Sequence, residues 1–239
     1  MAKLEKSNRR EIKKSKGVKI KKEKFNDINS RDLQFKLSND QIEAIQLIKD
    51  NDITVLMGKA GTGKTACACY AALFAYNHGE IDKIILTRPM VGTEDMGFLP
   101  GGLGEKYSPW LEPIYSNFGK MFNKHTIEGM IRNEIIEMKP LQFVRGITFE
   151  NAYVIIDEMQ NINISQIKLL LTRIGSGSKI ILCGDTDQID LKKKTDSGLS
   201  FLVNNKFDEI SGLAIYEMTE EHRKKIVIDI INKFNSILV

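Results

Sequence analysis

Residues 53–65 read ITVLMGKAGTGKT, and this stretch decides the fold. The opening ITVLM is a short apolar run of the kind that forms a buried strand. The remainder matches the pattern GxxxxGK[ST], in which a glycine-rich turn joins a strand to a helix and holds phosphates. Glycines are needed because the backbone wraps the phosphates closely and several φ angles are positive. The stretch therefore predicts a P-loop between a strand and a helix.

The P-loop assigns a chemical role to its residues. Lys64 is expected to bridge the β- and γ-phosphates, and the Thr65 hydroxyl to ligate Mg²⁺. Gln41, in the helical stretch before the strand, is expected to read adenine through its amide. The expected cofactors are therefore ATP and Mg²⁺. The expected nucleotide-binding residues are Gln41, Gly58, Lys59, Ala60, Gly61, Thr62, Gly63, Lys64 and Thr65.

Helical and strand patterns alternate along the rest of the chain. Residues 88–124, rich in Gly, Pro and aromatic residues, predict a long functional loop or a small insertion. Together with the P-loop, the alternation indicates an α/β fold with a parallel sheet flanked by helices. Strands are expected over 53–57, 83–87, 152–156, 178–183 and 213–218, and helices from Ser38 or Asn39 to 48 and over 64–78, 165–174, 197–203 and 226–238.

Carboxylates and an amide follow two of the expected strands. Asp157 and Glu158 come directly after the apolar run 154–156, where Asp157 is expected to hold the metal through water and Glu158 to act as general base. Gln188 ends the run GDTDQ after the next strand, and a carboxamide there can contact the γ-phosphate. Superfamily 1 helicases carry a closely similar GDxxQ. These residues favour hydrolysis of ATP by water over phosphoryl transfer to an acceptor.

One motif favours a different nucleotide. Residues 205–208 read NKFD, which matches the guanine-reading NKxD of GTPases. In GTPases that motif ends a buried strand, whereas here it follows the helical pattern of 197–203. GTP is therefore the weaker alternative to ATP.

Basic residues are concentrated at the amino-terminal end. Over residues 1–24, eleven Lys and Arg oppose three Glu, a net charge of +8, which leaves −4 of the total of +4 for the rest. A run so charged and so poor in apolar residues is expected to be a flexible tail that binds a polyanion such as nucleic acid. The alternative is a solubilising tail. We expect this tail over residues 1–30 and an ATPase domain over 31–239.

Composition excludes several other classes of protein. No apolar run approaches the roughly 18 residues of a membrane span, and no signal peptide is visible in the charged first residues, so no membrane partner and a cytoplasmic location are expected. Cys67, Cys69 and Cys183 have spacings that suit neither a zinc site nor a disulfide framework. They are expected to be small buried side chains.

Residues 87–101, TRPMVGTEDMGFLPG, resemble the most distinctive segment of the PhoH-like ATPase family. Thr93 stands where that family usually has glycine, and Met96 where it has leucine. The resemblance implies a RecA-like fold related to the first motor domain of superfamily 1 helicases, ATPase activity and RNA unwinding. Further matches lie at residues 145–146, 157–161 (DEMQN), 171–175 (LTRIG), 184–191 (GDTDQIDL), 197–199 (SGL) and 222–223, so that they span about residues 38–235.

The same resemblance points to nucleic-acid contacts. Arg88 stands where helicase-like motors touch the nucleic-acid backbone, and Pro89 and Arg145 are assigned with it. A surface salt bridge is the alternative role for Arg88. Three aromatic residues of the loop could stack on bases or anchor the loop, namely Phe98, Tyr107 and Trp110.

A helicase motor normally closes ATP between two RecA-like domains, and too few residues follow this motif set for a second. We therefore expect a homo-oligomer, such as a hexameric ring, in which Arg173 or Arg223 of a neighbour neutralises the transition state. The expected function is a Mg-dependent ATPase on single-stranded nucleic acid, RNA before DNA, with helicase or translocase activity. The alternatives are an ATP-switched RNA-binding module and a small-molecule kinase.

Overall fold

The computed structural model describes residues 37–89, 116–119, 123–141, 144 and 146–238. The basic tail, most of the loop that carries Phe98, Tyr107 and Trp110, and Arg145 lie outside the described residues. In the described part a six-stranded sheet has the order β3-β2-β4-β5-β1-β6, and all neighbouring strands are parallel. The strands are β1 (Ile53–Met57), β2 (Lys83–Thr87), β3 (Ile136–Met138), β4 (Ala152–Ile156), β5 (Lys179–Gly184) and β6 (Leu213–Glu217).

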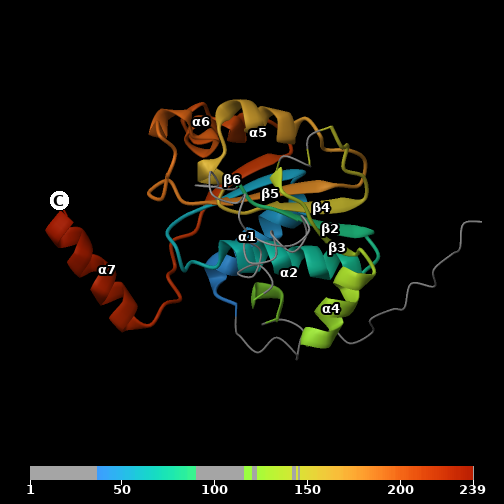
Figure 1. Cartoon of the computed structure of the whole chain (residues 1–239), viewed down its shortest axis with the longest axis horizontal. Coiled ribbons are helices and arrows are strands. Elements are labelled where there is room, and N and C mark those ends of the chain that lie inside the picture. The colour runs from blue at the N-terminus through green and yellow to red at the C-terminus, as the bar shows by residue number, and fades with distance from the viewer. Residues whose placement is uncertain (1–36, 90–115, 120–122, 142–143, 145, 239) are drawn as a thin grey trace, which may run out of the picture.

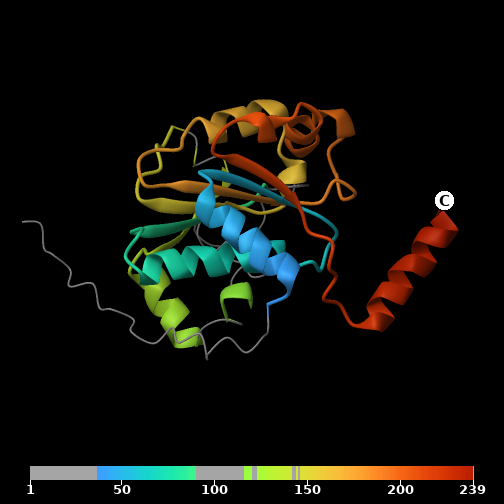
Figure 2. The same cartoon turned by 180° about the vertical axis from the view of Figure 1, so that it is seen from behind.

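Helices cover both faces of this sheet (Figures 1 and 2). One face carries α1 (Asn39–Asp50), α2 (Lys64–Asn77) and α4 (Lys124–Arg132), and the other carries α5 (Ile164–Leu171) and α6 (Gly198–Asn204). Successive strand residues point to opposite faces. Leu56 and Ile155 accordingly join the core under α1 and α2, whereas Val55 and Val154 join the core under α5 and α6. The continuous apolar runs of the central strands follow from this double coverage.

The topology confirms the expected RecA-like α/β fold. The P-loop strand β1 and the acidic strand β4 are not neighbours, because β5 lies between them. The bounds of β1, β2 and β4 are those expected, and Ser38 caps α1 with a capping box completed by Gln41. The carboxyl ends of β1, β4 and β5 therefore meet at one edge of the sheet.

Three expectations of secondary structure need correction. The helix expected to continue to residue 174 ends at Leu171, because the chain straightens and Ile174 forms a bridge with Phe149. Helix α4 and the three-residue strand β3 lie where no regular structure was expected. Strand β3 forms the edge of the sheet beside β2, and its Glu137 forms ion pairs with Lys83 and Lys139.

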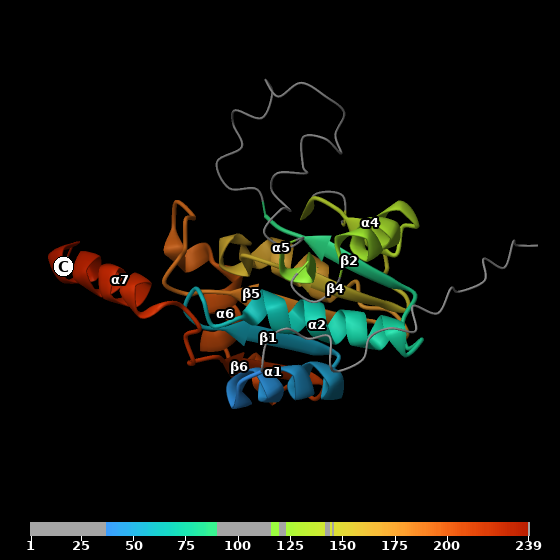
Figure 3. The same cartoon turned by 90° about the horizontal axis from the view of Figure 1, so that it is seen from below.

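The last helix, α7 (Lys225–Leu238), projects away from the body of the protein (Figure 3). Its apolar residues repeat at helical spacing, as the sequence pattern predicted. Several of these side chains are exposed to solvent, namely Ile226, Val227, Ile230, Phe234 and Ile237.

A buried carboxylate ties the chain after β6 to the start of α1. Asp40 accepts hydrogen bonds from the Tyr216 hydroxyl (2.7 Å) and from the backbone N–H groups of Thr219 (2.8 Å) and Glu220 (3.0 Å). Burial alone would raise the pKa of the Asp40 carboxyl, but the hydrogen bonds from Glu220, Tyr216 and Thr219 hold this pKa below its ordinary value. Asp40 thus fixes the segment after β6, whose next residues contact the P-loop.

We expect Asp40→Ala to lower the free energy of unfolding by about 2 kcal/mol, because three hydrogen bonds to a charged acceptor are lost. The folded-state pKa is depressed, so this stabilisation is complete above the ordinary carboxyl pKa and is lost as the pH falls through the lowered value. Urea denaturation of wild type and variant should therefore show a difference at pH 7 that narrows below about pH 4.

The matched control is Asp208→Ala, which removes an exposed carboxylate at the opposite end of the sheet. It should change the free energy of unfolding by less than about 0.5 kcal/mol. Equal losses in the two variants would show that Asp40 has no special structural role.

Candidate nucleotide site

The P-loop needs glycine at positions where a side chain would collide. Gly58 has φ +137°, and a Cβ there would lie 2.2 Å from the carbonyl oxygen of Met218. Gly61 has φ +99°, and its Cβ would lie 2.5 Å from Nε of Arg223. The loop is therefore packed against the segment after β6, which Asp40 holds in place, and His222 donates its backbone N–H to the Gly61 carbonyl at 3.0 Å.

Lys64 begins α2 and folds back over its own loop. Its ammonium group donates to the carbonyl oxygens of Gly58 (2.6 Å) and Lys59 (2.9 Å). The N-terminus of α2 has no side-chain cap on its first backbone N–H groups, an arrangement suited to an anion. A triphosphate bound here would compete with these two carbonyls for the lysine.

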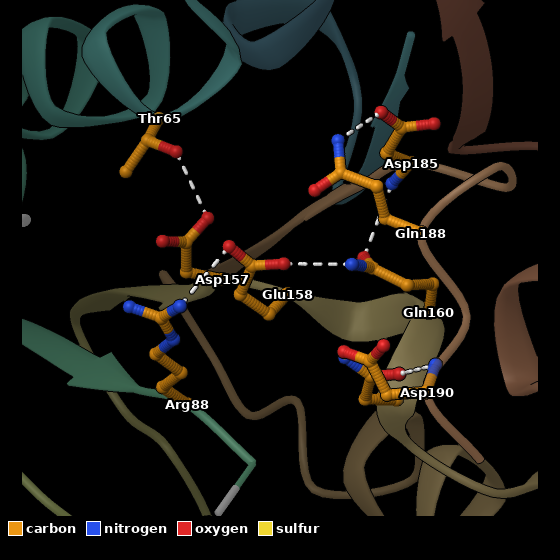
Figure 4. Close-up of polar contacts among 9 residues, drawn as sticks. Thr65, Arg88, Asp157, Glu158, Gln160, Asp185, Gln188 and Asp190 are labelled. Carbon is orange, nitrogen blue, oxygen red and sulfur yellow. Dashed lines mark hydrogen bonds and ion pairs between the residues drawn. The ribbon is translucent and has the colours of Figure 1, made fainter. Parts of the chain in front are cut away.

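Thr65 joins the P-loop helix to the acidic strand. Its hydroxyl donates to Oδ1 of Asp157 at 2.9 Å (Figure 4). Burial, followed by the charge of Glu158, raises the pKa of the Asp157 carboxyl above its ordinary value, although the Thr65 hydroxyl lowers it. A cation beside Asp157 would favour its ionised form.

The donor set fits Mg²⁺ shared with a nucleotide. Thr65 and Asp157 offer oxygen ligands, and Mg²⁺ in proteins is usually held by one or two carboxylates together with substrate phosphates and waters. Within the described ranges, no cluster of three or more His, Cys, Asp or Glu side chains could hold a metal ion by itself. The residues present thus fit a metal that is completed by a ligand's phosphates.

Glu158 follows Asp157 in a left-handed backbone conformation, with φ +54°. Oε1 of Glu158 accepts from Nη2 of Arg88 at 3.1 Å, and Oε2 accepts from Nε2 of Gln160 at 2.6 Å. Arg88 follows β2, so its guanidinium reaches Glu158 across the tips of two neighbouring strands (Figure 4). The ion-pair role that was the alternative for Arg88 is therefore realised, and its partner is the expected general base.

The tip of β5 supplies the remaining polar groups. Gln188 donates to Oδ2 of Asp185 at 2.6 Å, and the Asp185 backbone N–H donates to Oε1 of Gln160 at 3.1 Å. Gln160 thereby connects the β4 and β5 tips through the two ends of one amide (Figure 4). Gln160 lies inside the DEMQN motif, but its bridging contact depends on the packing of two strands and was not predicted.

Gln41 is already bonded on both sides of its amide. Its Oε1 accepts from the backbone N–H of Ser38 at 3.2 Å, and its Nε2 donates to the Thr62 carbonyl at 3.4 Å. Gln41 therefore braces the P-loop, and its reading of adenine stays a prediction.

One cavity of about 740 Å³ gathers most of the expected residues. This volume is in the range of small-ligand sites. His222 and Asp185, which were not assigned to the site, also line it. The lining includes Gln41, Ala60, Gly61, Gly63, Lys64, Thr65, Asp157, Glu158, Gln188 and Arg223.

The two candidate arginine fingers lie in different places. Arg223 lines the cavity of its own chain and lies directly over Gly61. Arg173 follows α5, and its carbonyl accepts from the N–H of Phe149, which precedes β4, so Arg173 is at the opposite edge of the sheet. Arg173 could therefore serve only another chain's site.

Two further sequence candidates lie away from the cavity or beside it. The NKFD motif at 205–208 precedes β6 at the opposite edge of the sheet, where a base bound at the P-loop is out of its reach. This position removes the structural basis for reading guanine.

Pro89, the other candidate, is buried next to Arg88.

Residues 35–235 match the family model described as PhoH-like protein. The chain belongs to the PhoH-like family. It is 42% identical over 198 residues to the PhoH-like protein of Bacillus subtilis, a match that covers 82% of this chain and 62% of the relative. It is 36% identical over 184 residues to Protein PhoH of Escherichia coli, covering 76% of this chain and 52% of that protein. The PhoH-like chain thus spans between about half and two thirds of the length of these relatives.

Some solved structures are similar to the chain at lower identity. The Pif1 helicase from Bacteroides in complex with ADP-AlF3 and ssDNA is 16% identical with a TM-score of 0.44, covering 86% of the PhoH-like chain and 47% of that chain. The Sulfolobus solfataricus SWI2/SNF2 ATPase core is 14% identical with a TM-score of 0.47, covering 83% of the PhoH-like chain and 47% of that chain.

In the part of the chain that the structure describes, no helix is both long and apolar enough to span a membrane.

We expect Lys64→Ala to weaken binding of a fluorescent ATP analogue with Mg²⁺ by at least about tenfold in Kd, because the cation that would bind the phosphates is lost. A fluorescence titration measures this change. Lys206→Ala is the matched control, since it removes an exposed lysine of the NKFD motif and should leave the affinity for both ATP and GTP analogues unchanged. An unaltered Kd in Lys64→Ala would contradict the site.

Proposed function

We propose that this PhoH-like chain is a Mg-dependent ATPase that acts on single-stranded nucleic acid and prefers RNA to DNA. The observation that carries the proposal is the convergence of three strand tips on one cavity: the P-loop after β1, Asp157 and Glu158 after β4, and Gln188 after β5. Each tip carries a group that hydrolysis of a triphosphate requires.

The chain's own residues divide the work of hydrolysis. Lys64 leaves the carbonyls of its loop and neutralises the β- and γ-phosphates. Glu158 accepts a proton from a water whose oxygen forms a bond to the γ-phosphorus. The bond from that phosphorus to the bridging oxygen breaks, and the electron pair leaves with ADP. Mg²⁺, held by Thr65 and Asp157, supplies neutralisation of phosphate charge when it is bound.

Two other groups line the same space. In this proposal Gln188, which lines the cavity and donates to Asp185, contacts the γ-phosphate and transmits its loss to the β5 tip. Arg223 lies over the P-loop of its own chain, which favours a role in cis for this arginine. A finger in trans from a neighbouring copy then falls to Arg173, and a ring such as a hexamer is the assembly in which it would act.

The nucleic-acid part of the proposal rests on Arg88 and on charge. Arg88 lies at the end of β2 beside Glu158, so a phosphate bound to it would lie next to the general base. The basic residues of 1–24 provide a second, sequence-independent attraction for a polyanion. The alternative of an ATP-switched RNA-binding module predicts RNA affinity that depends on ATP, but no stimulation of hydrolysis.

We expect wild type to release phosphate from Mg-ATP, faster with poly(U) than without it. Glu158→Gln should bind the ATP analogue with unchanged Kd and lose at least about 100-fold in kcat, because proton acceptance is removed. Phosphate release measures kcat and its stimulation, a fluorescence titration measures the Kd, and poly(dT) in place of poly(U) tests whether RNA or DNA stimulates more.

The control is Glu209→Gln, an equal change at an exposed glutamate at the far edge of the sheet, which should keep wild-type turnover. Turnover of Glu158→Gln equal to that of wild type would rule out the assigned base. Hydrolysis that ignores both polymers would favour the switch module or another substrate.

A further inference from the structure

Glu158 has a hydrogen-bond donor on each of its two carboxylate oxygens. Arg88 holds Oε1 with its guanidinium, and Gln160 holds Oε2 with its amide. A general base must direct one oxygen at the attacking water. The guanidinium of Arg88 takes a place on Oε1 of Glu158 that a water could otherwise fill.

The two donors differ in how firmly they are held. Gln160 is only 1% exposed, and its other amide atom is fixed by the backbone N–H of Asp185. The Arg88 side chain is 22% exposed, so solvent and ligands reach it. The contact with Gln160 is therefore built into the core, whereas the contact with Arg88 can be exchanged.

A backbone phosphate is a competitor that matches Arg88 chemically. A guanidinium group binds a phosphate in the same forked geometry in which it binds a carboxylate. Contacts to phosphates dominate the affinity of proteins for nucleic acid. The Arg88–Glu158 pair is partly exposed, and such pairs are weak enough for exchange.

We propose that Arg88 is a nucleic-acid-sensitive latch on the general base: a backbone phosphate that binds Arg88 draws it off Glu158 and frees Oε1 for the attacking water. Gln160 is the positioning residue that keeps Glu158 in place when the latch opens. The inference rests on the proposed ATPase function and gives its nucleic-acid stimulation a physical origin. By this route the polymer changes kcat with little change in ATP affinity.

The test compares Arg88→Ala and Arg88→Lys with wild type in phosphate release, with and without poly(U). With the latch removed, Arg88→Ala should raise the rate without poly(U) by about fivefold and bring the stimulation ratio close to one. The Kd of the ATP analogue should not change. Arg88→Lys keeps the charge without the fork and should give an intermediate rate, so it carries the test if the alanine variant fails to fold.

Arg132→Ala, which removes an exposed arginine at the end of α4, is the matched control and should keep both the rate and the stimulation of wild type. An unstimulated rate in Arg88→Ala equal to or below that of wild type overturns the latch, even if poly(U) binding weakens. In that case Arg88 only binds nucleic acid, or it supports hydrolysis by holding Glu158 in place.

Gln160→Met provides the second measurement, since it keeps the side-chain volume and removes both hydrogen bonds. We expect the poly(U)-stimulated kcat to fall about tenfold at unchanged KM for ATP. A change in KM alone, or a loss of stability with kcat intact, would make Gln160 merely structural and overturn its positioning role.

The outcomes separate the two proposals. If wild type hydrolyses ATP and responds to poly(U) while Arg88→Ala shows no elevated unstimulated rate, the latch alone is wrong. If wild type releases no phosphate from Mg-ATP at all, the proposed function is wrong and the latch falls with it.

Discussion

The contact between Thr65 and Asp157 is the interaction on which the rest of the site depends. The two oxygens are 2.9 Å apart, although their residues are 92 positions apart in the chain. They meet because β5 pairs with β1 on one side and β4 on the other, in parallel and in register. Any slip of either pairing would turn strand side chains to the wrong face and move the carboxylate away from the P-loop helix. The site is thus a property of the whole sheet.

The burial of this contact has a cost in stability at Asp157 and Glu158. Asp157 lies in a nearly closed position where burial raises the pKa of its carboxyl, and Glu158 next to it adopts a left-handed backbone conformation. Such features cost stability and persist where the surrounding structure enforces them. Here the enforcing groups are the Thr65 hydroxyl, the Arg88 guanidinium and the Gln160 amide. The same strand tip therefore holds the two carboxylates to which we assign the metal contact and the proton acceptance, and of the two donors on Glu158 only Arg88 is exposed enough to exchange.

Sequence patterns predicted those parts of the fold that depend on local periodicity. Strands β1, β2 and β4 are each built around a short run of mainly apolar residues, and their bounds were predicted correctly. Strand β3 was missed because three residues, one of them Glu137, make no apolar run, and the strand exists only by pairing with the edge of β2.

The site divides in the same way. Lys64, Asp157 and Gln188 belong to motifs whose spacing states their place, and the structure brings them to one cavity. The bridging of Gln160 and the anchoring by Asp40 depend on contacts between distant segments, which one sequence does not reveal.

A crystal structure with Mg²⁺, ADP and a fluoroaluminate tests the central claim most directly. We predict that Lys64 leaves the carbonyls of Gly58 and Lys59 for the phosphates, with Thr65 on the metal, Asp157 holding the metal through water and Gln188 facing the γ-position. A nucleotide bound elsewhere, or Lys64 still folded on its own loop beside one, would contradict it.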